Sequence, residues 1–488
     1  MPLDKRRPGS SAVRRLPLAA LAVLAALPVL AGCLSSHAGD PAAAQKARID
    51  HMSWEDLGAM QYNVSDAHSH AIREEHSEVA RNVTVTDFST FSANGTSLGE
   101  YTELDNAHGL IAMAVTYGCC GVDTRIVLLD EKALPKLKVL GAFDVTGAYG
   151  DVKIDETLPL VYVPYPGPRF SGAANANGYG FSIWDVSDPA HAKMAGQAPG
   201  GGCHMLNTIH IDGTPYVWCA SISGPTGYRI VQLPNGEWTG VPIDSAIPQS
   251  NPEILRYPTY YSSLTAAWPL LLLAPHDMTA QPDPVTHKPV LVVADEINGL
   301  RVFDIANPAA PVQLSAWRGE NAESPIERVH TALLAELGGR RIAFGATETL
   351  FNVPPQLYIV DMTDYAHPKY LGTWIPPGEK TDGGLAYSLH NFQVVGTRLY
   401  IANFHGGMWV LDVSDPGTPA PVALRVDVRD THYPRPDENL AGYPLNCNQF
   451  WDPIVVDGYL LGTDISSGVE VMHVDGDPAG DVNYTSFA

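Results

Sequence analysis

The sequence predicts an all-β fold, a seven-bladed β-propeller preceded by a short N-terminal segment of tether and helices, and three observations support this. A unit of two strand-like runs, joined by a glycine-containing turn and closed by aliphatic-x-aliphatic-Asp, recurs along the chain. Apolar and polar residues alternate within these runs, which is the period of a half-buried strand. Such a unit cannot bury its own apolar face, so its copies must stack on one another.

The copies are spaced widely enough for one four-stranded blade each. The clearest copy joins Leu399–Asn403 to Met408–Val413 through a turn at residues 405–407. The copies close at Asp130, Asp185, Gln232, Asp304, Asp361, Asp412 and His473. Their mean period of about 57 residues exceeds the roughly 40–50 of a compact blade, so loops must hold the excess. Because stacked sheets hide their edges by closing into a ring, seven copies predict seven blades. A β-solenoid is the alternative, with a shorter and more regular period.

Two copies also carry a family resemblance. Trp409–Pro416 and Ile183–Pro189 contain the phrase Asp-Val-Ser-Asp-Pro after an aliphatic or aromatic run. This phrase resembles the LVIVD-repeat propellers of bacteria and archaea. The resemblance implies a propeller over most of residues 105–480. It implies little about activity, because one fold hosts many functions.

The N-terminus has the pattern of a lipoprotein signal peptide over residues 1–32. Basic residues at positions 5–7, 14 and 15 precede an apolar run, Leu16–Leu30, that is too short to span a bilayer comfortably. Residues 30–33, Leu-Ala-Gly-Cys, resemble a bacterial lipobox, which implies a diacylated Cys33. An ordinary signal peptide with a chance cysteine is the alternative. We therefore expect an exported cell-envelope lipoprotein, on the periplasmic or cell-surface face, that reaches the membrane through its lipid alone.

Three parts are expected after these assignments: the signal peptide over 1–32, a lipidated tether with short helices over 33–80, and the propeller over 81–488. Helical composition covers Ala42–Met60 and Ala71–Ala80. The formal net charge of −23 argues against a nucleic-acid partner. The expected partner is a protein or a small molecule at the propeller face, where loops 164–179, 243–275 and 347–356 would lie. Aromatic residues there would contact it or, alternatively, pack within blades: Tyr162, Tyr165, Phe170, Tyr257, Tyr260 and Tyr261.

The cysteines leave several pairings open. Export permits disulfides, and acylation of Cys33 leaves an odd number of thiols: Cys119, Cys120, Cys203, Cys219 and Cys447. At least one thiol therefore stays free. Cys203 and Cys219 lie within one repeat and can pair, whereas Cys447 can instead approach the first blade if the ring closes there.

Four histidines occupy one position of the repeat. His204, His276, His330 and His390 precede the first clear strand of their copies, which leaves room for an inner strand and a hairpin. Inner strands line the axis of a propeller, so these side chains are expected to face one axial space. Neutral imidazoles bind copper or iron well, and the neighbouring Asp277 and Asn391 would accept the second ring N–H. The alternative is that the imidazoles form hydrogen bonds between inner strands.

Two hypotheses of function follow. The first is a lipid-anchored propeller that acts as a binding or scaffold module, with a candidate axial metal site. The second rests on a distant similarity, in propeller type and histidine placement, to selenium-binding proteins and methanethiol oxidases. Because those proteins bind copper through histidines, the similarity implies that this chain is an oxidoreductase that depends on copper or iron. The sequence contains neither a phosphate-binding glycine loop nor a Gly-x-Ser-x-Gly motif, and it does not assign catalytic residues.

Overall fold

The computed structural model describes residues 41–62, 79–92, 98–117, 123–166, 178–221, 224–243, 247, 275–296, 298–319, 329–348, 354–378, 388–426, 450–465 and 467–477. The chain divides into two compact units, Met1–Ala44 and Gln45–Ala488. Of the first unit, only residues 41–44 at the start of helix α1 (Pro41–His51) are described. The second unit holds helix α2 (Trp54–Tyr62) and all the strands that the structure describes.

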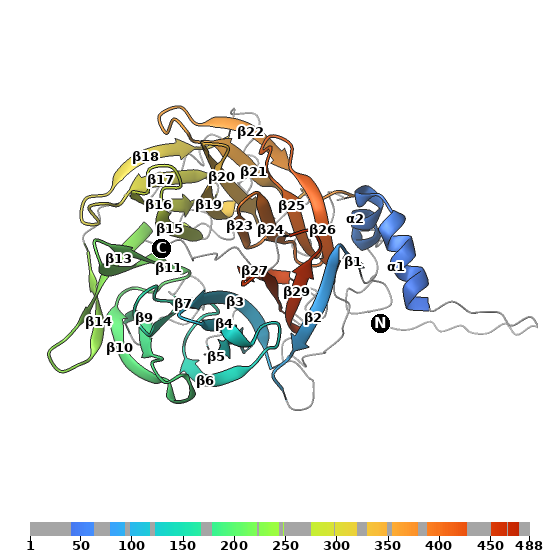
Figure 1. Ribbon diagram of the computed structural model, residues 1–488. Coiled ribbons are helices and arrows are strands. Elements are labelled where there is room, and N and C mark those ends of the chain that lie inside the picture. Colours follow the sequence, from blue (N-terminus) through green and yellow to red (C-terminus); the bar gives the residue numbers. More distant parts are fainter. Residues whose placement is uncertain are drawn as a thin grey trace, which may run out of the picture. The chain divides into compact units, whose positions relative to one another are not determined.

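The second unit is an all-β propeller, which confirms the predicted class (Figure 1). Five sheets contain four or five strands, which follow one another from the axis outward. They are β3 (Glu100–Ala107), β4 (Leu110–Thr116), β5 (Asp123–Asp130) and β6 (Val139–Thr146); β15 (Asp277–Pro282), β16 (Pro289–Ala294), β17 (Leu300–Asp304) and β18 (Val312–Trp317); β19 (Val329–Leu337), β20 (Arg340–Thr347), β21 (Leu357–Asp361) and β22 (Lys369–Trp374); β23 (Phe392–Val395), β24 (Arg398–Ala402), β25 (Met408–Asp412), β26 (Ala420–Val426) and β1 (Val79–Arg81); and β27 (Phe450–Val456), β28 (Tyr459–Asp464), β29 (Gly468–Val474) and β2 (Val83–Ser89).

The sixth sheet among the described residues has eight strands. It joins β7 (Lys153–Ile154), β8 (Leu160–Pro164), β9 (Tyr179–Asp185) and β10 (Lys193–Pro199) to β11 (Leu206–Ile211), β12 (Thr214–Ser221), β13 (Gly224–Gln232) and β14 (Trp238–Pro242). The link is a short parallel pairing of the two outer strands, β10 and β14, at Gly196–Trp238 and Gln197–Thr239. All other pairings within this sheet are antiparallel.

Apolar layers between neighbouring sheets hold the ring together. One layer packs Tyr101 and Met113 of the β3–β6 sheet against Val456 and Leu461 of the sheet of β27. Corresponding layers lie between the other neighbours, as expected for repeats that stack to bury their faces. Strand β2, early in the chain, completes the sheet formed by the last three strands. This pairing closes the ring.

In the repeats that close with an aspartate, that residue stabilises the turn that follows it. Asp412 Oδ1 accepts a hydrogen bond from the Ser414 backbone N–H at 2.9 Å, and Asp185 Oδ1 accepts one from Ser187 at 3.0 Å. Asp304 and Asp361 likewise accept a hydrogen bond from the backbone N–H of the residue two positions later. These are Asx turns, in which a short carboxylate satisfies the backbone as the chain leaves a strand. The repeated sequence phrase therefore has a local structural cause.

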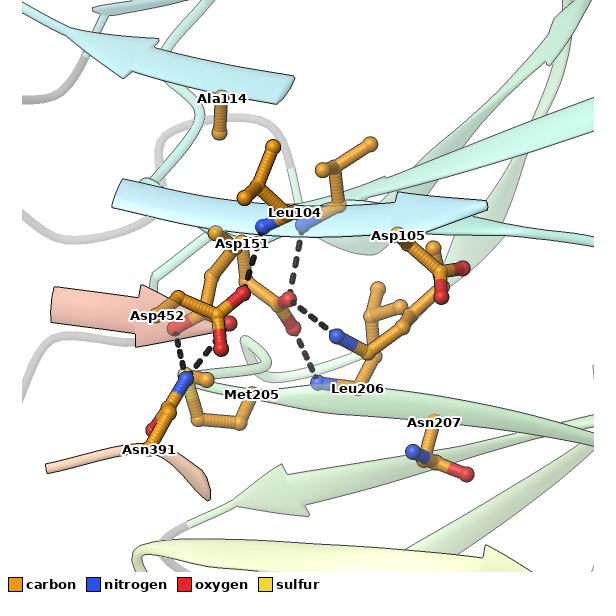
Figure 2. Close-up of polar contacts among 12 residues, drawn as sticks. Leu104, Asp105, Ala114, Asp151, Met205, Leu206, Asn207, Asn391 and Asp452 are labelled. Atoms are coloured by element: carbon orange, nitrogen blue, oxygen red, sulfur yellow. Dashed lines mark hydrogen bonds and ion pairs between the residues drawn. The ribbon is translucent and has the colours of Figure 1, made fainter. Parts of the chain in front are cut away.

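Polar side chains form hydrogen bonds between adjacent inner strands along the axis. Asp452 Oδ2 accepts from Leu104 N at 2.7 Å, and Asp151 Oδ2 accepts from Leu206 N at 2.6 Å (Figure 2). The same kind of bond joins four further pairs: Asp105 to Ile154 N, Asn207 to Ala280 N, Gln281 to Leu334 N and Gln393 to Val455 N. Each side chain satisfies a backbone N–H of the next sheet, so these bonds fix the rotation of neighbouring sheets around the axis.

The N-terminal segment differs partly from the prediction. Helices α1 and α2 cover the expected Ala42–Met60 region and extend one residue before it and two residues beyond it, and Trp54 packs on Trp409 with ring centroids 6.1 Å apart. The helix expected over 71–80 is wrong at its end, because Val79–Arg81 pairs with β26 as a strand; the residues before Val79 lie outside the described part. Tertiary pairing overrides local propensity at this point. No helix in the described residues is long and apolar enough to cross a bilayer.

Candidate metal centre

The four predicted histidines lie at the same end of four successive inner strands. His204 and His276 come just before β11 and β15, and each donates its backbone N–H to the second strand of its sheet, to Ala220 O and Ala294 O. His390, before β23, does the same to Ala402 O. His330 lies inside β19, at a register shift between Val329 and Thr331. Such a bulge re-aims a side chain, and in β19 it keeps His330 in line with the others.

The imidazoles form a row in which each ring contacts the next. The ring centroids are 4.5 Å apart for His204 and His276, 4.0 Å for His276 and His330, and 4.1 Å for His330 and His390. The two Nε2 atoms of His204 and His276 lie 3.1 Å apart. All four residues are at most 7% exposed. The expectation from repeat position, that the four side chains meet at the axis, therefore agrees with the structure.

Aromatic residues flank both ends of the row. Tyr149 lies beside His204 with ring centroids 5.0 Å apart, and Trp451 packs on His390 at 3.8 Å. Phe404 also stacks on His390 at 5.2 Å. The backbone carbonyl of Trp451 lies 3.0 Å from His390 Nδ1. Because a carbonyl only accepts, this nitrogen carries a proton, which makes Nε2 the acceptor nitrogen of the neutral His390 ring.

One carboxylate near the row was not predicted. One ligand atom each from His276, His330 and Glu348 lie within 4.8 Å of one another. Glu348 follows the second strand of its sheet, β20, and is partly buried. Three other sheets carry a buried polar residue near this position: Asp295 and Asn403 follow β16 and β24, and Asp464 is the last residue of β28. The signal in the sequence that could have found Glu348 is therefore a polar residue at or directly after the end of the second strand in several repeats.

The two residues expected to orient the imidazoles have other contacts in the described structure. Asp277 accepts hydrogen bonds from the Thr331 hydroxyl at 2.8 Å and from the Met278 backbone at 2.6 Å. The Asn391 amide donates to both carboxylate oxygens of Glu103, at 2.8 and 2.7 Å. Both side chains thus belong to a second polar group on the axis, next to the imidazole row.

This second group lines an axial cavity of about 450 Å³ with acidic side chains. We call it the axial carboxylate group. Glu103, Asp105, Asp277, Asp452 and Lys153 line the cavity, and Asp151 joins the group through its ion pair with Lys153 at 3.3 Å. Burial raises the pKa of Asp105 and of Asp277 to about 6 and that of Asp452 to about 7. Burial and the nearby Asp452 raise the pKa of Glu103 well above its usual range. Burial lowers the pKa of Lys153, but Asp151 and the other carboxylates outweigh it and raise that pKa well above normal.

The other predicted site residues divide into packing residues and residues outside the described part. Tyr162 and Tyr165 are buried in apolar layers between sheets, which supports the packing interpretation. Phe170, Tyr257, Tyr260 and Tyr261 lie outside the described residues, as do Cys33, Cys119, Cys120 and Cys447. Cys203 and Cys219 form a disulfide, so the structure selects this one of the open pairings. The bridge ties the residue before His204 to strand β12.

Comparison with known proteins assigns the repeat. Residues 291–316 and 390–424 match the LVIVD repeat. The chain carries LVIVD repeats. The second match begins at His390, so one member of the imidazole row opens a recognised repeat. The repeat and the propeller confirm that part of the sequence interpretation, whereas neither bears on a selenium-binding or lipoprotein assignment.

Solved structures add little beyond this. A structure described as "COPII on membranes, outer coat vertex" is 9% identical and matches 77% of this chain and 84% of its own, with a TM-score of 0.49. Saccharomyces cerevisiae Sqt1 is 11% identical over 75% of this chain and 80% of its own, with a TM-score of 0.45. Similarity at this level carries no argument about function. A sequence search of curated proteins found no match.

Proposed function

We propose that this chain is an exported β-propeller that acts as a binding or scaffold module and holds a transition-metal ion with its imidazole row. The observation that carries the proposal is the spacing of the nitrogen atoms. Ligands bound at about 2.0–2.1 Å in tetrahedral geometry lie roughly 3.3–3.4 Å apart. The Nε2 atoms of His204 and His276 are 3.1 Å apart, close to that separation.

The ligand set suits copper or iron. His276, His330 and Glu348 would supply two imidazoles and one carboxylate, with His204 and His390 on either side. Imidazole suits copper, iron and zinc, and a set of two histidines and one carboxylate is the pattern of non-haem iron(II) sites. The hydrogen bond from His390 Nδ1 to the Trp451 carbonyl supports a role for Nε2 as a ligand.

A metal-dependent oxidoreductase, of the selenium-binding or methanethiol oxidase type, is the second candidate. It is favoured by the trio His276, His330 and Glu348, which would leave coordination positions open. Open positions are typical of catalytic metals, whereas structural sites are filled by protein ligands. A small substrate would then reach the ion along the axis.

The test is the metal content of the purified mature chain by plasma mass spectrometry, after separate loading with copper, iron and zinc. We expect near-stoichiometric copper or iron, and its loss in a His276→Ala/His330→Ala variant. The matched control is His191→Ala/His367→Ala, because both of these imidazoles are more than 80% exposed and pair only with Asp188 and Asp364. No retained metal after loading would leave the row as hydrogen-bonded structural histidines and refute the metal proposal.

We also propose that the chain is exported and anchored to a membrane by a lipid on Cys33. The lipobox-like residues 30–33 support both export and the anchor. The Cys203–Cys219 disulfide also supports export, because disulfides persist in oxidising compartments. A Cys33→Ala variant is expected to move from the membrane fraction to the soluble fraction of expressing cells. An unchanged membrane fraction would contradict the anchor.

We further propose that the ring has seven blades. This count divides the eight-stranded sheet at the parallel pairing of β10 and β14, whose two halves are four-stranded and antiparallel. An apolar layer between β8–β9 and β11–β13 supports the division, because layers of this kind separate the other blades. An experimental structure viewed down the axis would test the count, and six inner strands around the axis would refute it.

A further inference from the structure

The most unusual polar group outside the imidazole row consists of Glu103 on β3, Asp452 on β27 and Asn391 just before β23. They are 2%, 6% and 7% exposed, and all three line the axial cavity. Asp452 uses one oxygen to accept from Leu104 N, and Glu103 accepts from the Asn391 amide. Three segments far apart in the sequence thus bring two carboxylates and one carboxamide to a single place.

The negative charge of this group lacks a cation at contact distance among the described residues. Lys153 forms its ion pair with Asp151, at 3.3 Å, and acts on Glu103 and Asp452 only at longer range. Elsewhere in the molecule a buried acid has a guanidinium beside it: Glu470 pairs with Arg425 at 2.7 Å, and Asp283 pairs with Arg341 at 2.6 Å. Buried charges normally require such a partner. Burial and the nearby Asp452 raise the pKa of Glu103, as expected for a buried carboxylate that has no cation in contact with it.

Asn391 provides a second, independent indication. Its Nδ2 donates to Glu103, but its buried Oδ1 accepts no hydrogen bond within the described part of the chain. A buried acceptor without a donor is costly. A half-turn of the carboxamide exchanges the two atoms and places Oδ1 toward the Glu103 oxygens. Three oxygens would then face one another, which is unfavourable alone and favourable around a cation.

We propose that Glu103, Asp452 and Asn391 Oδ1 bind a hard divalent cation such as calcium in the axial cavity, at a site distinct from the imidazole row. Carboxylate and carboxamide oxygens are the ligands such ions prefer, and calcium takes 6–8 of them at 2.3–2.6 Å. A cavity of about 450 Å³ leaves space for the waters that complete the shell, each occupying about 30 Å³. The site does not depend on the imidazole proposal, because it shares no ligand with it.

Trp451 offers a direct reporter for this site. Its indole N–H donates to Glu103 Oε1 at 3.1 Å, so an ion on Glu103 would lie within a few ångströms of the ring. Tb³⁺ replaces Ca²⁺ in oxygen sites, and its emission is excited by a nearby tryptophan. The experiment titrates Tb³⁺ into the metal-free mature chain, with tryptophan excitation, and then displaces it with Ca²⁺.

The variants separate this site from the imidazole row. Glu103→Gln/Asp452→Asn should weaken Tb³⁺ binding at least about tenfold. It keeps a side-chain oxygen that can accept from Leu104 N, so its urea midpoint in chelator should equal or exceed that of the wild type. Trp451→Phe should remove the emission, while Ca²⁺ binding measured by calorimetry stays within a few-fold. Trp238→Phe, on outer strand β14, is the matched control and should leave the emission unchanged. His276→Ala/His330→Ala should also leave it unchanged.

The results decide the proposal in either direction. Emission that Ca²⁺ displaces, and that depends on Glu103, Asp452 and Trp451, supports it. Absence of sensitised emission in the folded wild type overturns it, as does emission that survives Glu103→Gln/Asp452→Asn. Loss of emission in the histidine variant alone would place the ion in the imidazole row and equally overturn a separate carboxylate site.

Discussion

Strand β15 begins with one aspartate, Asp277, and is followed directly by another, Asp283. The two carboxylates have opposite electrostatic environments. At the start, Asp277 lies in the axial carboxylate group, and burial raises its pKa to about 6. Just past the end, Asp283 accepts from Arg341 Nε at 2.6 Å and Nη2 at 2.8 Å, and from the Tyr365 hydroxyl at 2.6 Å. Burial alone would raise the pKa of Asp283, but these hydrogen bonds outweigh it and hold that pKa well below its usual range.

The difference separates residues that serve stability from residues available for function. A buried carboxylate with a bidentate guanidinium is complete and has no capacity for a ligand. The axial carboxylates share one lysine, and their charge is balanced only by proton uptake or by a bound cation. Perturbed acids of this kind gather at functional sites. The contrast between the two aspartates therefore favours the axis, and not the Asp283 end, as the binding region.

The largest expected effect comes from one substitution made at both ends of β15. Asp283→Asn leaves Arg341 as a buried charge without its partner and should lower the free energy of unfolding by about 3–5 kcal/mol. Asp277→Asn keeps an acceptor for Met278 N and a partner for the Thr331 hydroxyl, so its effect should stay within about 1 kcal/mol. Urea unfolding in chelator measures both. Equal losses at the two ends would break the comparison.

A second prediction concerns what holds the axial end in place. The disulfide closes a loop with a sequence separation of 16, so Cys203→Ser/Cys219→Ser should cost about 3 kcal/mol of unfolding free energy. Because Cys203 precedes His204, the same variant should weaken transition-metal binding by about tenfold. Tb³⁺ emission at Glu103 should not change. A variant that keeps full transition-metal affinity would show that the disulfide does not position a metal ligand.

The fold followed from the sequence because its signals are local and repeated. Alternation placed β24 and β25 to within one residue, and the closing aspartates marked turns that they do cap. The outer-strand pairing of β10 with β14 had no such signal. It depends on how two neighbouring sheets approach each other, and no residue of either strand encodes that on its own.

The candidate site was predictable only where it obeys the repeat. The four histidines share a repeat position, so their meeting followed from topology. Glu103 and Lys153 have no counterpart at that position and come from separate strands that only the closed ring brings together. Asp277 and Asn391 were read as partners of their sequence neighbours, yet alternation along a strand turns adjacent side chains to different surroundings. Sequence adjacency was therefore the wrong guide to contact.

The smallest predicted effect is a pH dependence confined to the Asp283 end. The pKa of Asp283 is lower in the folded chain than in the unfolded chain, so the unfolded chain binds more protons at acidic pH. Its contribution to stability is complete above the unfolded value of about 4 and is lost as the pH falls toward the folded value. Urea midpoints recorded from about pH 5 down to about pH 3 should therefore fall more steeply for the wild type than for Asp283→Asn. Lys153, Asp151 and the other axial groups are unchanged in that pair, so the difference isolates Asp283 and its partners Arg341 and Tyr365. Parallel slopes would mean that the guanidinium does not stabilise the ionised carboxylate, and the contrast between the two ends of β15 would then have to rest on burial alone.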